Sequence, residues 1–141
     1  MSEQEDVRIP AHPPRTMSGL LRAVLFAQAA YYAVTAVWPW VHMDSFEAVT
    51  GEKLDDWLVR TVGALIFVTA AALGTAAWRR DTGAPVLVLA IGSAALLGAV
   101  ETGYAAIGRI SPIYFADAVA EAVIIAGVLA GLARRPGGNE P

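Results

Sequence analysis

The sequence of 141 residues contains no cysteine, which excludes disulfide bonds, thiolate metal sites and thiol redox chemistry. Charge is scarce: 16% of the residues are Asp, Glu, Lys or Arg, against about one quarter in soluble domains. The net charge is −3, and no basic run with interleaved aromatic residues occurs, so nucleic acid is not an expected partner. The chain also lacks a phosphate-binding loop, a haem-ligand pair and a nucleotide fingerprint, and no cofactor is expected.

Hydrophobic residues, in contrast, make up 56% of the chain. Four long apolar runs cover Leu20–Val41, Trp57–Trp78, Ala84–Gly108 and Ile113–Ala133. A helix needs about 20 apolar residues to cross a bilayer core of about 30 Å. A soluble bundle is the disfavoured alternative, because four such runs leave too little polar face. The sequence therefore predicts an all-α integral membrane four-helix bundle, with one four-span domain over residues 18–135.

The distribution of basic residues predicts the orientation of the four spans. Lys and Arg in short loops favour the cytoplasmic side of a membrane. One side would hold Arg8, Arg15, Arg22, Arg79, Arg80, Arg134 and Arg135. The other would hold Lys53, Arg60 and Arg109. We therefore expect a multi-pass protein of the cell membrane with both termini in the cytoplasm. Residues 1–17 and 136–141, rich in proline, glycine and polar residues, are predicted to be disordered tails.

The longest connection, residues 42–56, is predicted to hold a short amphipathic helix on the outer surface. Residues Asp44 to Glu47 have capping-box spacing, and Gly51 is suited to end the helix. Phe46 and Val49 are expected to face the membrane. A plain solvated loop is the alternative interpretation of the same segment.

Four ionisable residues lie inside the apolar runs: Arg60, Glu101, Asp117 and Glu121. A rise of about 1.5 Å per residue places all four in the outer third to half of the bilayer. A charge that faces lipid at mid-depth costs about 2.5–3.5 kcal/mol, so we expect all four to turn inward into one buried cluster. Tyrosines on the same helix faces extend this cluster. The predicted binding residues are Arg60, Glu101, Asp117, Glu121, Tyr104, Tyr114 and Tyr31.

One arginine against three carboxylates leaves a formal charge of −2, which a dry cluster does not hold. A protonated carboxyl, a bound cation or entering water would restore the balance. The sequence therefore predicts a pocket that binds or transports a small cationic or amphipathic ligand, or protons. One alternative is a structural or accessory subunit whose charges only lock the bundle. Another is a membrane-embedded acid–base enzyme acting on a lipid-like substrate. A metal site at the three carboxylates is the weakest interpretation.

Small residues recur every four positions along the runs. Gly127 and Gly131 form a GxxxG pair, and Ala95, Ala99 and Gly103 form a second stripe. In lipid, helices associate through close backbone approach at such stripes. The stripes therefore indicate a tight bundle, and they equally suit a homodimer seam. The expected partners are membrane lipid, a small-molecule or lipid-like ligand, and a second copy of the chain at Gly127 and Gly131.

Overall fold

The computed structural model describes residues 17–134. Five helices make up this part of the chain: α1 (Gly19–Val41), α2 (Met43–Thr50), α3 (Asp56–Arg79), α4 (Ala84–Ala106) and α5 (Tyr114–Ala133). The two predicted tails lie outside the described residues, except for Met17. That residue is buried against the core, so the packed domain begins one residue earlier than the sequence predicted.

The four long helices confirm the four predicted spans, with ends within two residues of the apolar runs. They contain 23, 24, 23 and 20 residues, and each is long and apolar enough to cross a membrane. At about 1.5 Å per residue they measure roughly 30 to 36 Å, which matches the hydrocarbon core. The protein is therefore a small all-α, multi-pass membrane protein.

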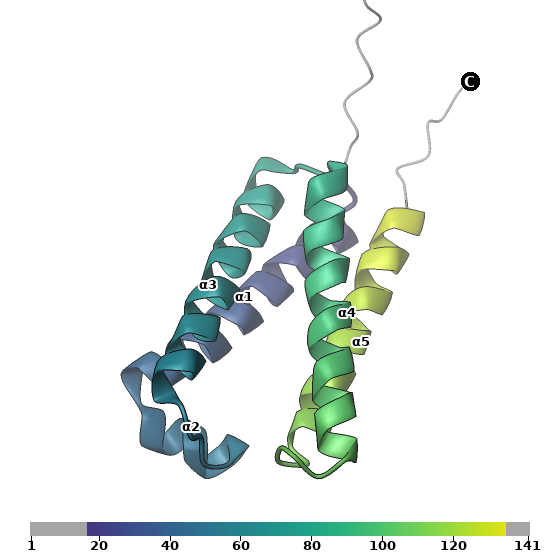
Figure 1. The fold of residues 1–141 in the computed structure, drawn as a ribbon. Coiled ribbons are helices and arrows are strands. Elements are labelled where there is room, and N and C mark those ends of the chain that lie inside the picture. Colours follow the sequence, from purple (N-terminus) through teal and green to yellow (C-terminus); the bar gives the residue numbers. More distant parts are fainter. Residues whose placement is uncertain (1–16, 135–141) are drawn as a thin grey trace, which may run out of the picture.

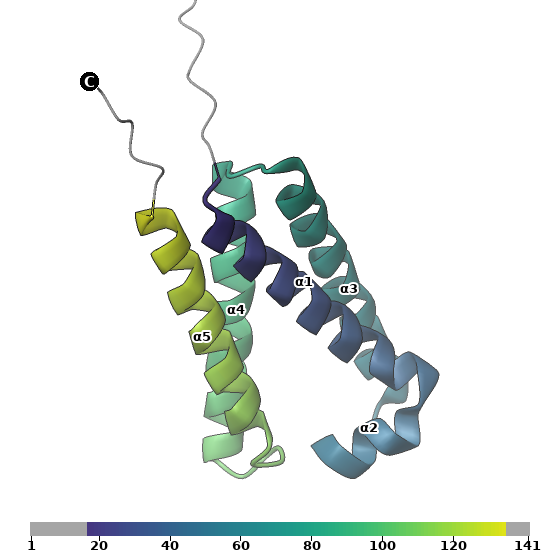
Figure 2. The same ribbon diagram turned by 180° about the vertical axis from the view of Figure 1, so that it is seen from behind.

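The long helices form two pairs, α1 with α3 and α4 with α5 (Figure 1). The pairs meet near the end of the bundle that carries both described termini, and they diverge toward the other end (Figure 2). Helix α2 lies across that second end, which we call the α2 end. A pocket lined by residues of all five helices lies between the diverging pairs; we call this region the wedge, and it contains the candidate site.

Helix α5 joins the two pairs by packing against α1. A β-carbon added to Gly131 would lie 2.7 Å from the Leu21 Cα, and one added to Gly127 would lie 2.9 Å from Val24 Cγ2. The Ser18 hydroxyl, which caps α1, donates a hydrogen bond of 2.6 Å to the Gly131 carbonyl. The GxxxG pair therefore serves contact within the chain. The second stripe, at Ala95, Ala99 and Gly103, is exposed on α4.

The apolar core lies between the helix pairs, on the side of the termini. Its buried side chains include Leu21, Leu25, Leu73, Ala77 and Val128. On the outside of the bundle, large apolar residues such as Leu65, Val88, Leu96, Val119 and Val123 are exposed. Exposed apolar side chains in such number fit helices whose solvent is lipid.

Replacing Gly131 by alanine tests the contact between α1 and α5. The added methyl group has no space against the Leu21 backbone, so G131A should destabilise the protein by about 1–3 kcal/mol. The control is G92A, because a β-carbon at Gly92 meets nothing within 4 Å and alanine favours the helix. Thermal unfolding in detergent should show a lower midpoint for G131A and an unchanged or higher one for G92A. Equal midpoints would contradict this packing.

Candidate functional site

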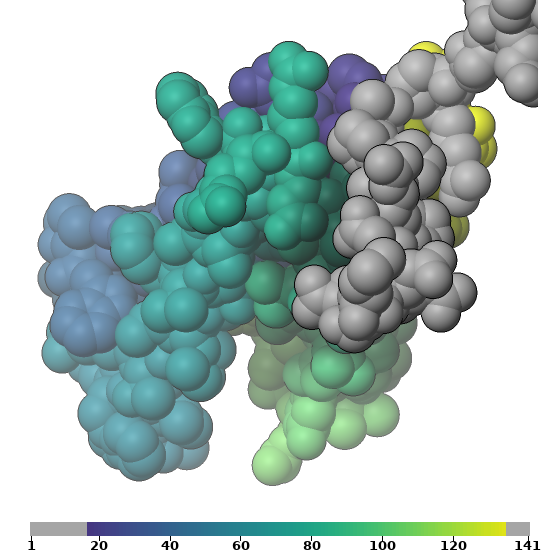
Figure 3. Space-filling model, turned by 90° about the horizontal axis from the view of Figure 1, so that it is seen from above, coloured from purple at the N-terminus to yellow at the C-terminus, as the bar shows by residue number. Residues whose placement is uncertain are grey.

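A cavity of about 850 Å³ occupies the wedge, and residues from all five helices line it. Its size lies within the range of about 300–1,000 Å³ that is usual for small-molecule sites. The walls are mostly aliphatic and aromatic. The aromatic lining residues are Tyr31, Tyr32, Trp38, Phe46 and Tyr114. Seen along the helices from the side of the termini, a recess separates α3 from the ends of α4 and α5 (Figure 3).

Three carboxyl side chains line this cavity: Glu101 from α4, and Asp117 and Glu121 from α5. Glu101 is 9% exposed and Glu121 is 2% exposed, whereas Asp117 is partly exposed. Asp117 and Glu121 are four residues apart, so they lie on one face of α5. The structure thus places all three predicted acids at one cavity.

Glu121 is held by a tyrosine and not by an arginine. The Tyr32 hydroxyl donates a hydrogen bond of 2.9 Å to Glu121 Oε2, and Ser93 Oγ lies 3.4 Å from the same hydroxyl. Four residues before Tyr32 on α1, the buried Gln28 donates from Nε2 to the Ala90 carbonyl at 2.9 Å. These groups form a buried polar line between α1 and α4 that extends from the cavity into the core.

Glu101 has a different environment. Its Oε2 atom is buried and has no hydrogen-bond partner among the described residues, although the residue lines the cavity. A buried acceptor left without a donor costs about 1–3 kcal/mol, and more when it carries charge. Glu101 is therefore the residue of the cavity wall at which an additional hydrogen-bond donor would be most strongly favoured.

Lys53 is the single basic residue among the described residues that line the cavity. Its ammonium group donates to the carbonyls of Thr50 at 2.9 Å and Gly51 at 2.8 Å. It also lies 5.8 Å from the ring centre of Phe46 and 5.5 Å from that of Tyr114. This position of Lys53 was not predicted from the sequence. A signal was present, because Gly51 ends α2 with a φ of +89° and turns the following residues back toward the wedge.

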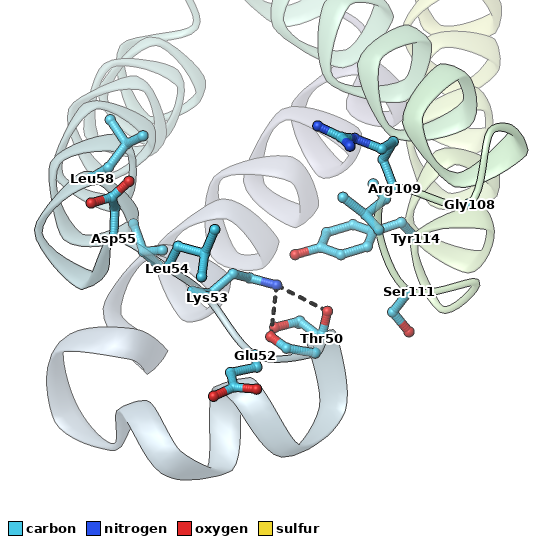
Figure 4. A pocket seen from close by; sticks show the side chains of 13 residues that line it. Thr50, Glu52, Lys53, Leu54, Asp55, Leu58, Gly108, Arg109, Ser111 and Tyr114 are labelled. Atoms are coloured by element: carbon cyan, nitrogen blue, oxygen red, sulfur yellow. Dashed lines mark hydrogen bonds between the residues drawn. The ribbon is translucent and has the colours of Figure 1, made fainter.

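Lys53 also separates the cavity from a smaller vestibule of about 460 Å³ at the α2 end. Figure 4 shows Lys53 on one side of this vestibule, with Tyr114 and Arg109 on the other. A β-carbon added to Gly51 would lie 3.9 Å from Ser111 Cβ, so the two loops approach each other here. Arg109 lines the vestibule but not the acidic cavity.

Two predicted site residues do not line the cavity. Arg60 lies on α3, half buried, and its carbonyl accepts a hydrogen bond of 3.1 Å from the Trp40 indole. Helix α3 presents Val59 and Gly63 to the cavity instead. Tyr104 is 51% exposed, because three residues beyond Glu101 the helix has turned about 60° short of a full circle. Tyr31 and Tyr114 do line the cavity.

The predicted short helix between the first two spans forms, but its N-cap differs. His42, and not Asp44, caps α2, because its Nδ1 accepts from the Ser45 amide at 3.2 Å. Phe46 packs edge-on against Trp38, with ring centres 5.7 Å apart. Phe46 and Val49 both line the cavity. The wedge therefore offers both residues an apolar surface within the protein, although Val49 remains 46% exposed; contact of this face with the membrane stays a prediction.

Residues 17–134 contain no group of three or more His, Asp or Glu side chains arranged to hold a metal ion. No protein-family model, curated protein or solved structure matches this chain. The function must therefore be argued from the chemistry of the cavity.

Replacing Tyr32 by phenylalanine tests the hydrogen bond that holds Glu121. Y32F removes the donor and leaves a buried carboxyl oxygen without a partner, so it should lower stability by about 1–3 kcal/mol. The variant Y104F is the control, because Tyr104 is half exposed and does not line the cavity. Thermal unfolding in detergent should separate the two variants. Equal midpoints would show that the Tyr32 hydroxyl does not support Glu121.

Proposed function

We propose that the protein binds a small amphipathic cation in the cavity, and that the α2 end faces the outside of the cell. The observation that carries this proposal is the side chain of Glu101, a nine-tenths buried residue that lines the cavity and whose Oε2 atom has no partner among the described residues. A ligand with a cationic N–H group would supply the missing donor. Hydrogen bonds between ionised partners are also about twice as strong as neutral ones.

The charge of the lining supports a cationic ligand. Three carboxyl groups face one ammonium group, that of Lys53. Two of the three hydrogens of that ammonium are already donated to backbone carbonyls. Buried charges are stable only when they are paired or otherwise compensated. A cation in the cavity would offset this excess of carboxyl groups.

The walls support a ligand with an apolar body. Tyr31, Trp38, Phe46 and Tyr114 place aromatic rings around the cavity, and aromatic faces attract cations with about 0.5–2 kcal/mol each. Aliphatic side chains from α3, including Val62 and Ile66, form another wall. Such a lining favours an amine or guanidinium with an aromatic or aliphatic group over a hydrated inorganic ion.

The orientation supports uptake from the outer side. In the four-span topology predicted from the sequence, seven Arg residues fall on the side of the termini and three basic residues on the other side, and the richer side is normally cytoplasmic. The vestibule and the cavity would then open toward the outer leaflet, and the ligand would enter past Lys53. This is the position expected of a carrier or a ligand-binding subunit.

The two alternatives have less support. An accessory subunit whose charges only lock the fold would be expected to pair every buried carboxylate, and Glu101 is not paired in this way. An acid–base enzyme would need a reacting group beside the acids. The Tyr32 hydroxyl contacts one of these acids, but it does so as a hydrogen-bond donor to Glu121.

Benzylguanidinium and benzylurea form a matched pair of probes for the proposal. They have nearly the same shape and both carry N–H donors, but only the guanidinium is charged. Isothermal titration of the detergent-solubilised protein should show saturable binding of benzylguanidinium and much weaker binding of benzylurea. A charged hydrogen bond contributes about 1.5–3 kcal/mol, so E101Q should weaken guanidinium binding about tenfold or more.

The control variant is D81N, because Asp81 lies in the loop between α3 and α4, outside both cavities. Asparagine can still accept the bond that Asp81 Oδ1 accepts from the Gly83 amide. The affinity of the D81N variant for benzylguanidinium should equal that of the wild type. Equal affinity for the two probes, or an unchanged affinity in E101Q, would refute the proposed site.

A further inference from the structure

We propose that cation binding in this cavity displaces a proton, and that the proton leaves from Glu101. This inference rests on the proposed function and adds a coupled chemical event to it. The protein would then exchange one positive charge for another, and its affinity for the ligand would depend on pH.

The carboxyl groups of the cavity outnumber its basic groups. Glu101, Asp117 and Glu121 share a space with mostly apolar walls, and Lys53 is the single described cation in it. Carboxylates that share an apolar site cannot all remain ionised, because like charges repel and desolvation penalises each of them. With no ligand present, at least one of the three must therefore carry a proton.

The environments of the three carboxyl groups indicate which of them carries the proton. Glu121 accepts a hydrogen bond from Tyr32, which favours its ionised form. Asp117 is only partly buried, so desolvation penalises its charge less than that of the other two. Glu101 is nine-tenths buried, and its Oε2 has no donor. Of the three groups, Glu101 therefore has the least to stabilise a negative charge, and the proton belongs on Glu101.

The other titratable side chains of the cavity are consistent with a proton on Glu101. The titratable side chains that line the same cavity are Tyr31 and Tyr32 from α1, Lys53 after α2, and Tyr114, Asp117 and Glu121 from α5. Helix α3 contributes no titratable side chain among the described lining residues. Lys53 is held at the boundary with the vestibule by backbone carbonyls. No described cation is therefore placed to neutralise Glu101 at the same cavity wall.

The exchange is balanced in atoms and charge. The O–H bond of the Glu101 carboxyl breaks, the proton passes to water, and the remaining carboxylate pairs with the ligand cation. One proton leaves for each cation bound, and no electron is transferred. The formal charge of the cavity is the same before and after, which removes the electrostatic cost of placing a cation in a buried site.

Benzylguanidinium is a suitable probe because a guanidinium stays protonated, with a pKa above about 12. Any proton released on binding, and any pH dependence, therefore belongs to the protein. Titration in two buffers of different ionisation enthalpy measures the number of protons released. We expect up to one proton per bound cation at pH values where Glu101 is protonated in the free protein, and an affinity that rises by up to about tenfold per pH unit until Glu101 is ionised there.

Two variants separate Glu101 from its neighbours. E101Q should bind more weakly and release no proton, whereas E121Q, in which Tyr32 can still donate to the amide oxygen, should bind and release about one proton. Saturable wild-type binding without proton release and without pH dependence would overturn this inference and leave the proposed function intact. Proton release that persists in E101Q or is lost in E121Q would overturn the assignment to Glu101. Absence of saturable binding in the wild type would overturn both.

Discussion

The structure depends on the close approach of α1 and α5 near the end that carries the termini. Gly131 lies against the Leu21 backbone and Gly127 against Val24, so two helix pairs are joined at that end. Without water, helices in a bilayer gain stability mainly from such close packing. The same contact sets the geometry of the other end, because the pairs diverge away from it (Figure 2). The cavity is the space that this divergence leaves.

The divergence of the helix pairs also explains why the buried acids lie toward the α2 end. Toward the termini, the space between the helix pairs is filled by residues such as Leu25 and Leu73. Nearer the α2 end the interior widens, and Glu121 and Glu101 line it. Tyr32 connects the two regions, because its hydroxyl contacts Glu121 while its ring belongs to the core. Tyr32 of α1 therefore contributes both to the packing of the core and to the chemistry of the site.

Much of this arrangement could be predicted from the sequence. Hydrophobic runs fixed the four spans to within two residues, because span length is set by the bilayer. The cost of exposing acids to lipid correctly predicted that Glu101 and Glu121 are buried. That cost does not say which neighbour each acid meets. The contact between Tyr32 and Glu121 joins residues 89 positions apart, and no local pattern encodes it.

The position of Lys53 illustrates the same limit. Its place at the cavity depends on the turn at Gly51 and on the tilt between the helix pairs, which is a property of the whole bundle. Arg60 was predicted at the site because it is charged and lies within a span. Arginine has a long side chain, however, and needs no inward-facing position near the end of a span. The charge and depth of a residue were enough to predict that the acids line the cavity. They were not enough to predict which basic residue does.

The central claim is that a reachable space with excess negative charge lies between the helix pairs. Since the chain has no cysteine, a single introduced thiol can probe it with cationic and anionic methanethiosulfonates of similar size. Ala120 lines the cavity, and Ala122 is exposed on the same helix outside it. In lipid nanodiscs, A120C should react, and faster with the cationic reagent, while A122C should be nearly inert. Equal or anion-selective reaction of A120C, or no reaction at all, would contradict the account.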